Sequence, residues 1–171
     1  MDISGAIGRY AEYFVCAQLN KMNLEAFHVG RSFDLLLIYE GRPYRIDVKS
    51  SDGPRWRVGK NSMRIVNGIR RQTRIRRIEP KDTELLALFH RQTKKVVFRA
   101  VLAPTLSVRL SPSEIREAGD GSASLRKAIL ALNQQHNMPE NNDKFSSLSP
   151  HLLHKYFSYS GYPIPTRSTD K

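Results

Sequence analysis

Residues 33–51 constrain the fold more than any other part of the chain. The segment Phe33–Glu40 reads F-D-L-L-L-I-Y-E, and its nearly continuous apolar run is typical of a strand that is covered on both faces. A turn-forming group, Glu40-Gly41-Arg42-Pro43, follows it. Tyr44–Ser51 then reads Y-R-I-D-V-K-S-S, with apolar residues at alternate positions. We therefore predict two antiparallel strands joined in a hairpin.

The polar residues of this hairpin fall into a pattern. Side chains alternate across a strand, so Asp47, Lys49 and Ser51 share one face, opposite Tyr44, Ile46 and Val48. Taken alone, Asp47 and Lys49 are most simply a surface ion pair.

Asp34 lies at the start of the apolar strand, where an unpaired carboxylate is costly to bury. In a hairpin closed at residues 40–43, Asp34 and Asp47 fall at the same end, with Lys49 close by. The alternative for Asp34 is a strand-start residue that caps a neighbouring loop.

A third acidic residue is available on a predicted N-terminal helix. Apolar and aromatic residues recur at three- and four-residue steps from about Gly5 to Asn23, after a possible N-cap at Ser4. Glu12 lies about 20° from Leu19 around the helix axis, at the border of the apolar stripe. A helix packed on the sheet can therefore aim Glu12 at the carboxylate end of the hairpin. The simple alternative is a solvated helix residue.

The remaining patterns predict an α/β fold with a mixed central sheet flanked by helices. Further strands are expected at 25–29, 84–90 and 95–102, and helices after the capping-box sequence at Ser111 and from 124 to 133. We predict a core at 1–103 with a basic excursion at 53–78, then a helical part at 104–160 packed on or extending the core, and a flexible tail at 161–171.

The charge of the chain indicates a polyanionic partner. The chain has 28 Lys and Arg residues against 16 Asp and Glu residues, a net charge of +12. Nine of the basic residues lie within 53–78, which has no acidic residue: Arg55, Arg57, Lys60, Arg64, Arg70, Arg71, Arg74, Arg76 and Arg77. Arginine suits bidentate contact with phosphate. The segment lacks the bulky apolar face of an interfacial helix, so we predict that it binds nucleic acid and not a membrane.

The cellular setting is predicted from what the chain lacks. Its single cysteine excludes an intrachain disulfide framework, and no apolar run is long enough to cross a bilayer. The N-terminus has no signal-peptide pattern, so we expect a cytoplasmic protein.

Paired carboxylates beside a lysine have the chemistry that phosphodiester hydrolysis needs. Carboxylate oxygens bind hard divalent cations such as Mg²⁺, for which Mn²⁺ can substitute. The cation lowers the pKa of a bound water and screens charge on the phosphate. A nearby lysine can deprotonate or orient the water, or stabilise the transition state electrostatically, and the spacing leaves these roles open.

The ordered set of Glu12, F-D-L at 33–35 and D-V-K at 47–49 resembles the PD-(D/E)XK nuclease superfamily. The strings G-A-I-G-R-Y-A-E-Y-F-V, S-F-D-L-L-L and I-D-V-K-S-S resemble its group I intron-associated homing endonucleases and its Holliday-junction resolvase-like proteins. The match covers residues 4–51 well and 83–103 loosely, and Phe33 stands where the motif has proline.

The resemblance implies a restriction-endonuclease-like fold and specific roles. It implies that Asp34, Asp47, the backbone carbonyl of Val48 and Glu12 bind the metal, directly or through water. It also implies that Lys49 is the catalytic lysine.

We therefore predict an Mg²⁺-dependent DNA endonuclease, with the site-specific homing type as its finer form. The alternatives are a junction-resolving nuclease and a non-catalytic nucleic-acid-binding protein on a nuclease scaffold. Because duplex DNA has two strands, we expect a homodimer or homotetramer.

Overall fold

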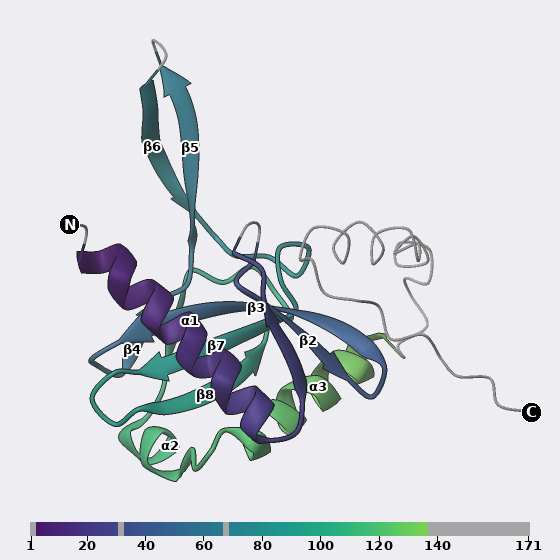
Figure 1. The fold of residues 1–171 in the computed structure, drawn as a ribbon. Helices are drawn as coiled ribbons and strands as arrows, with labels where there is room; N and C mark the ends of the chain where they lie inside the picture. Colours follow the sequence, from purple (N-terminus) through teal and green to yellow (C-terminus); the bar gives the residue numbers. More distant parts are fainter. Residues whose placement is uncertain (1–2, 31–32, 67–68, 137–171) are drawn as a thin grey trace, which may run out of the picture. The chain divides into compact units, whose positions relative to one another are not determined.

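A computed structural model describes residues 3–30, 33–66 and 69–136 (Figure 1). The chain divides into two units, Met1–Gln135 and His136–Lys171, and nearly all of the described residues belong to the first. The predictions for residues 137–171 lie outside the described residues.

The first unit is built on a five-stranded sheet with the order β1-β2-β3-β7-β8. The strands are β1 (Glu25–His28), β2 (Leu35–Tyr39), β3 (Arg42–Ser51), β7 (Leu85–His90) and β8 (Lys95–Ala100). β3 and β7 are parallel and the other neighbours are antiparallel, so the sheet is mixed. The helices that flank it are α1 (Ile3–Lys21), α2 (Pro112–Glu117) and α3 (Ser122–His136). The α/β class with a mixed, helix-flanked sheet is confirmed.

The predicted hairpin is β2–β3. Leu35 pairs with Ile46 and Tyr39 with Arg42. Glu40 and Gly41 close the turn with positive φ angles of 50° and 76°, which suit the right-handed twist of a hairpin. The prediction that the apolar and polar positions of the second strand separate onto two faces is also confirmed by the two cores of the protein.

The first core lies between one face of the sheet and the helices α1 and α3. The sheet contributes Tyr44, Ile46 and Val48 from β3 together with alternate residues of the other strands. The helices contribute Ala11, Val15, Leu19, Leu125, Ala128, Ile129 and Leu132. The 3.6-residue period of α1 and the two-residue period of β3 therefore meet in a single apolar layer.

The second core covers the opposite face. Leu86 and Leu88 of β7 pack there with Trp56, Val58 and Ile78, and with Ile115 of α2. Trp56 is 1% exposed, and its indole N–H donates to the carbonyl of Phe89. Trp56 therefore anchors the packing, and its ring is not accessible for stacking on a base.

Two helix starts differ in how well the sequence predicted them. The capping box is confirmed: Ser111 Oγ accepts from Glu114 N at 3.1 Å, and Glu114 Oε2 accepts from Ser111 N at 2.8 Å. The predicted N-cap at Ser4 is wrong, because α1 already begins at Ile3 and Ser4 lies in its first turn.

The basic excursion contains β4 (Arg55–Arg57), β5 (Lys60–Val66) and β6 (Ile69–Arg76). β5 and β6 form an antiparallel hairpin that extends away from the central sheet, as Figure 1 shows. Near its base, Val58 N donates to Leu106 O at 3.0 Å, and Ile78 and Thr105 exchange two hydrogen bonds of 2.8 Å. The segment that ends in β9 (Ser107–Arg109) therefore holds both ends of the hairpin.

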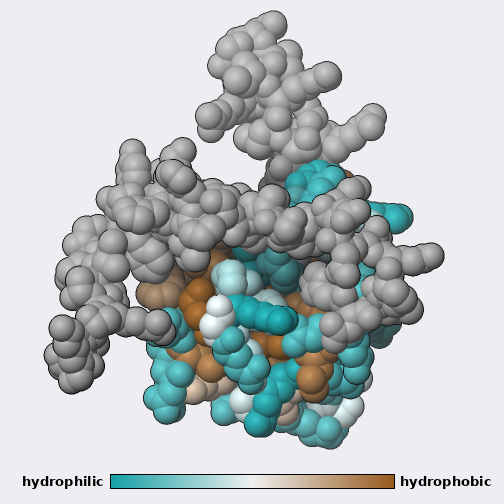
Figure 2. Space-filling view, turned by 90° about the vertical axis from the view of Figure 1, so that its right-hand side faces the viewer, coloured by the Kyte–Doolittle hydropathy of each residue, from teal (hydrophilic) through white to brown (hydrophobic). Residues whose placement is uncertain are grey.

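The surface of the described residues carries scattered apolar side chains. Figure 2 shows one side of the molecule, where hydrophobic residues lie among hydrophilic ones. The large exposed apolar residues are Tyr10, Tyr13, Phe27, Ile75, Leu102, Leu106 and Leu130. None of the described helices is both long enough and apolar enough to cross a membrane.

Gly59 provides a test of how the hairpin is held. A Cβ at this position would lie 2.6 Å from Ile75 Cγ2, 2.7 Å from Arg76 O and 2.8 Å from Leu106 Cδ1. We expect Gly59→Ala to lower the free energy of unfolding by about 2 kcal/mol, because the close contact with the backbone oxygen of Arg76 can be relieved only by moving the main chain. Urea unfolding measures this change.

Gly53→Ala is the matched control, since a Cβ at Gly53 meets no atom within 4 Å. Equal stability of the two alanine variants would contradict the tight packing at the base of the hairpin.

Candidate active site

The carboxylate of Asp34 is held at the end of the β2–β3 pair. β3 has ten residues and β2 only five, so β3 runs past the start of β2. The N–H of Val48 donates to Asp34 Oδ2 at 2.7 Å, while Asp34 N donates to Ile46 O at 3.0 Å. Asp34 thus caps a backbone N–H of the strand β3, and not a neighbouring loop as its alternative interpretation proposed. The same bond also places the carboxylate at the end of the hairpin where Asp47 lies, as predicted.

Asp47 and Lys49 lie on the second face of the sheet, opposite α1. In the parallel register they pair with Leu86 and Leu88, which belong to the second core. Lys49 Nζ is 2.7 Å from Asp47 Oδ2, and Asp47 is only 4% exposed whereas a quarter of the Lys49 side chain is accessible. The pair is therefore partly buried and differs from the solvated surface pair that the sequence alone favours.

The oxygen Asp47 Oδ2 has unused binding capacity. It is buried, and it accepts no well-oriented hydrogen bond from the described residues, although Lys49 Nζ is close to it. A buried carboxylate oxygen without such a bond is costly. A cation between Asp34 and Asp47 would satisfy it, so these two residues fit a divalent metal.

The pKa of Asp34 is raised, in part by neighbouring negative charge. It is raised from 3.8 to about 6, chiefly by burial and next by the Asp47 carboxylate. Lys49 and the hydrogen bond from Val48 N oppose this shift, and Glu12 adds the weakest of the five effects. The site therefore disfavours two adjacent negative charges, and a bound cation would relieve this repulsion.

Glu12 is held by a partner that the sequence did not predict. Its Oε2 lies 2.6 Å from His28 Nε2, and the ring of Tyr13 stacks on the His28 ring at 4.9 Å. Within residues 3–30, 33–66 and 69–136, no three His, Cys, Asp or Glu residues form a group that can hold a metal. Glu12 is near enough to raise the pKa of Asp34 slightly. Among the described residues, however, it does not form a three-residue metal-binding group with Asp34 and Asp47. His28 is the last residue of β1, and no sequence spacing signals its pairing with a helix residue.

Val48 is predicted to bind the metal through its backbone carbonyl, and its side chain packs elsewhere. Its side chain is 7% exposed in the first core, and its N–H is bonded to Asp34. Metal binding by the Val48 carbonyl and by Glu12 stays a prediction.

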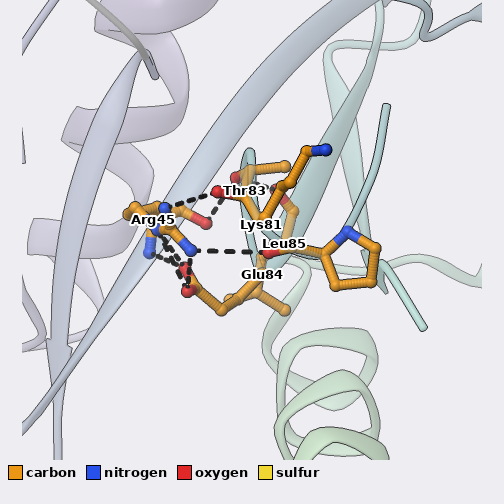
Figure 3. A network of polar contacts seen from close by, with 6 residues as sticks. Arg45, Lys81, Thr83, Glu84 and Leu85 are labelled. Carbon is orange, nitrogen blue, oxygen red and sulfur yellow. Dashed lines mark hydrogen bonds and ion pairs between the residues drawn. The ribbon is translucent and has the colours of Figure 1, made fainter. Parts of the chain in front are cut away.

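Arg45 links β3 to the loop that precedes β7 (Figure 3). Its guanidinium binds both oxygens of Glu84, and its backbone N–H donates to Glu84 Oε2 at 2.8 Å. Nη1 donates to Lys81 O at 2.8 Å, and Thr83 Oγ1 donates to Arg45 O at 2.7 Å. These contacts, two residues from Asp47, fix the parallel pairing of β3 and β7.

The predicted DNA-binding residues lie in three settings. Arg55 and Arg57 are exposed on β4, and Arg77 is exposed after β6. Arg76 forms two 2.6 Å contacts with Asp82, so it helps to hold the base of the hairpin. The others belong to the strands of the hairpin: Lys60, Arg64, Arg70, Arg71 and Arg74.

Comparisons with known proteins give limited information. No protein-family model matches the chain, and no curated protein matches it. Among solved structures, the bacterial homing endonuclease I-Ssp6803I is similar, with 15% sequence identity and a TM-score of 0.48. The alignment covers 78% of this chain and 96% of the endonuclease. The case for a function therefore comes from the side chains of this protein.

The raised pKa of Asp34 predicts how stability changes with pH. The folded protein holds this proton more tightly than the unfolded chain, so the group stabilises the fold fully below pH 3.8 and loses that contribution as the pH rises through about 6. In EDTA and well above pH 6, we expect Asp34→Asn to be more stable than the unsubstituted protein by on the order of 2 kcal/mol.

This difference should vanish in acid, and thermal unfolding over a pH series measures it. Magnesium should raise the Tm of the unsubstituted protein more than that of the variant. A variant that is less stable above pH 6 would contradict the account of charge crowding.

Proposed function

We propose that the protein is a divalent-metal-dependent endodeoxyribonuclease that hydrolyses phosphodiester bonds in DNA. The observation that carries this proposal is the convergence of Asp34 and Asp47 at one end of the hairpin, with Lys49 Nζ 2.7 Å from Asp47. The motif, the nuclease resemblance and the basic hairpin support the same function.

Asp34 and Asp47 are the residues that would hold Mg²⁺ or Mn²⁺, with the Val48 carbonyl and Glu12 as further ligands. When bound, the cation supplies Lewis acidity, which makes water more acidic and draws charge from the phosphate. The hydrogen bond from Val48 N leaves Asp34 one oxygen outside that bond. The surrounding second core keeps bulk water from Asp47, so charges interact strongly there.

Lys49 is proposed as an electrostatic stabiliser. Its ammonium faces the Asp47 carboxylate and carries positive charge to the edge of the buried site. Its partial exposure lets it reach a phosphate oxygen as negative charge develops during attack. A lysine that already faces a carboxylate is better placed for this role than for removing a proton.

The basic hairpin is proposed to lie along the backbone of duplex DNA. Six predicted DNA-binding residues belong to β5 and β6, including Arg76 at the base, and the base of this hairpin is fixed to the body of the protein. A site-specific homing-type endonuclease with a PD-(D/E)XK core is the form of the proposal that we favour. With one site per chain, cutting both strands requires a second copy or a second encounter.

The test is nicking of supercoiled plasmid with Mg²⁺ and with Mn²⁺. We expect Asp47→Asn to reduce the nicking rate by about 100-fold or more while leaving DNA binding intact, because it removes a metal ligand and leaves the fold. Glu117→Gln, at an exposed position of α2, is the matched loss of one carboxylate and should leave the rate unchanged.

Linear duplex and four-way junction substrates compared side by side separate a homing-type enzyme from a junction resolvase. Absence of cleavage of every DNA substrate with both metals would overturn the proposal and favour a non-catalytic binding protein.

A further inference from the structure

The small sheet β4–β9 presents a cluster of arginines on its outer face. Arg55 pairs directly with Arg109, and Arg57 pairs with Ser107. Trp56 and Val108, the pair between them, point inward and pack in the second core. Because side chains alternate along both strands, the four polar residues share the outward face.

Two arginines at directly opposed positions repel one another. Like charges across a strand pair destabilise a sheet, and the buried Trp56 offsets this cost here. Four other arginines each pair with a carboxylate: Arg45 with Glu84, Arg76 with Asp82, Arg91 with Asp52 and Arg99 with Glu114.

Among the described residues, neither Arg55 nor Arg109 has an acidic partner within ion-pair distance. Both guanidinium groups therefore keep their full capacity for an external anion.

A hollow of about 460 Å³ lies at this pair, lined by Pro54, Arg55, Ser107 and Arg109. Opposed residues on adjacent strands have Cβ atoms about 5 Å apart, so two long arginine side chains can converge on one tetrahedral anion. A guanidinium donates two parallel hydrogen bonds to phosphate oxygens, and the Ser107 hydroxyl is a further donor in the hollow.

We propose that Arg55 and Arg109 together bind one backbone phosphate of duplex DNA, as a contact separate from the β5–β6 hairpin. The choice of DNA as the source of the phosphate rests on the proposed nuclease function. Arg55 follows the end of β3 by four residues, and the chain between Ile78 and Arg109 holds the base of the hairpin. The pair is therefore connected along the chain both to the hairpin and to the strand that carries Asp47 and Lys49.

The site assigns a role to Arg109, which lies outside the arginine-rich segment of the sequence. It becomes part of the basic surface only because β9 returns to pair with β4.

The test measures the affinity for a short DNA duplex in EDTA, where cleavage does not interfere, over a series of KCl concentrations. We expect Arg109→Gln to weaken binding by about 10-fold, because a charge-assisted contact is lost. Arg126→Gln on α3 removes the same charge from an exposed residue and is the matched control. The Tm of Arg109→Gln should not fall, since the substitution removes a repulsion.

The double variant Arg55→Gln/Arg109→Gln tests whether the two arginines share a phosphate. Each phosphate contact contributes about 0.9 to the slope of log K against log salt, so the double variant should lose about 0.9 and not twice that amount. A loss of about 1.8 in that slope would mean two separate phosphates and would overturn the shared site.

An unchanged slope in both arginine variants, as in Arg126→Gln, would also overturn the site. The outcome is independent of catalysis. Unchanged slopes with normal nicking by the unsubstituted protein would reject this site alone. A reduced slope without any nicking would support the phosphate site and reject the nuclease function.

Discussion

The position of β3 at the centre of the sheet is the constraint on which the rest of the structure depends. It is bonded to β2 on one side and, in parallel, to β7 on the other, so its two faces belong to two different cores. One face packs beneath α1 and α3, and the other carries Asp47 and Lys49 into a partly buried environment. The overhang of β3 past β2 leaves Val48 N to be satisfied by Asp34. A backbone requirement thus holds the Asp34 carboxylate at the end of the hairpin where Asp47 lies.

The base of the hairpin and the site are joined by a continuous set of contacts. Arg76 binds Asp82, and Asp82 Oδ2 also accepts from Glu79 N at 3.0 Å. The same loop binds Arg45 through Glu84 and the backbone of Lys81. A hairpin held in this way keeps a defined position relative to β3. DNA bound along it would therefore meet the carboxylates at a fixed place, as positional control of hydrolysis requires.

The sequence predicted the parts of the site that depend on local periodicity. Alternation along 44–51 and the turn at 40–43 were enough to place Asp34, Asp47 and Lys49 at one end of one hairpin. Contacts between distant segments could not be predicted in this way. The pairing of Glu12 with His28 depends on how α1 lies on the sheet, and the Arg55–Arg109 pair depends on the return of β9 to β4. The run of basic residues also did not reveal that Arg76 contacts Asp82, and DNA binding by Arg76 stays a prediction.

Asp34 and Asp47 are proposed to form a divalent-metal site. A crystal of the protein soaked in Mn²⁺ and measured at the manganese absorption edge tests this most directly. We expect an anomalous peak within bonding distance of both carboxylates, about 2.2 Å from their oxygens, and its loss in Asp47→Asn. The metal site would be contradicted if a fully soaked crystal showed no anomalous peak between the two aspartates and Lys49 Nζ still contacted Asp47.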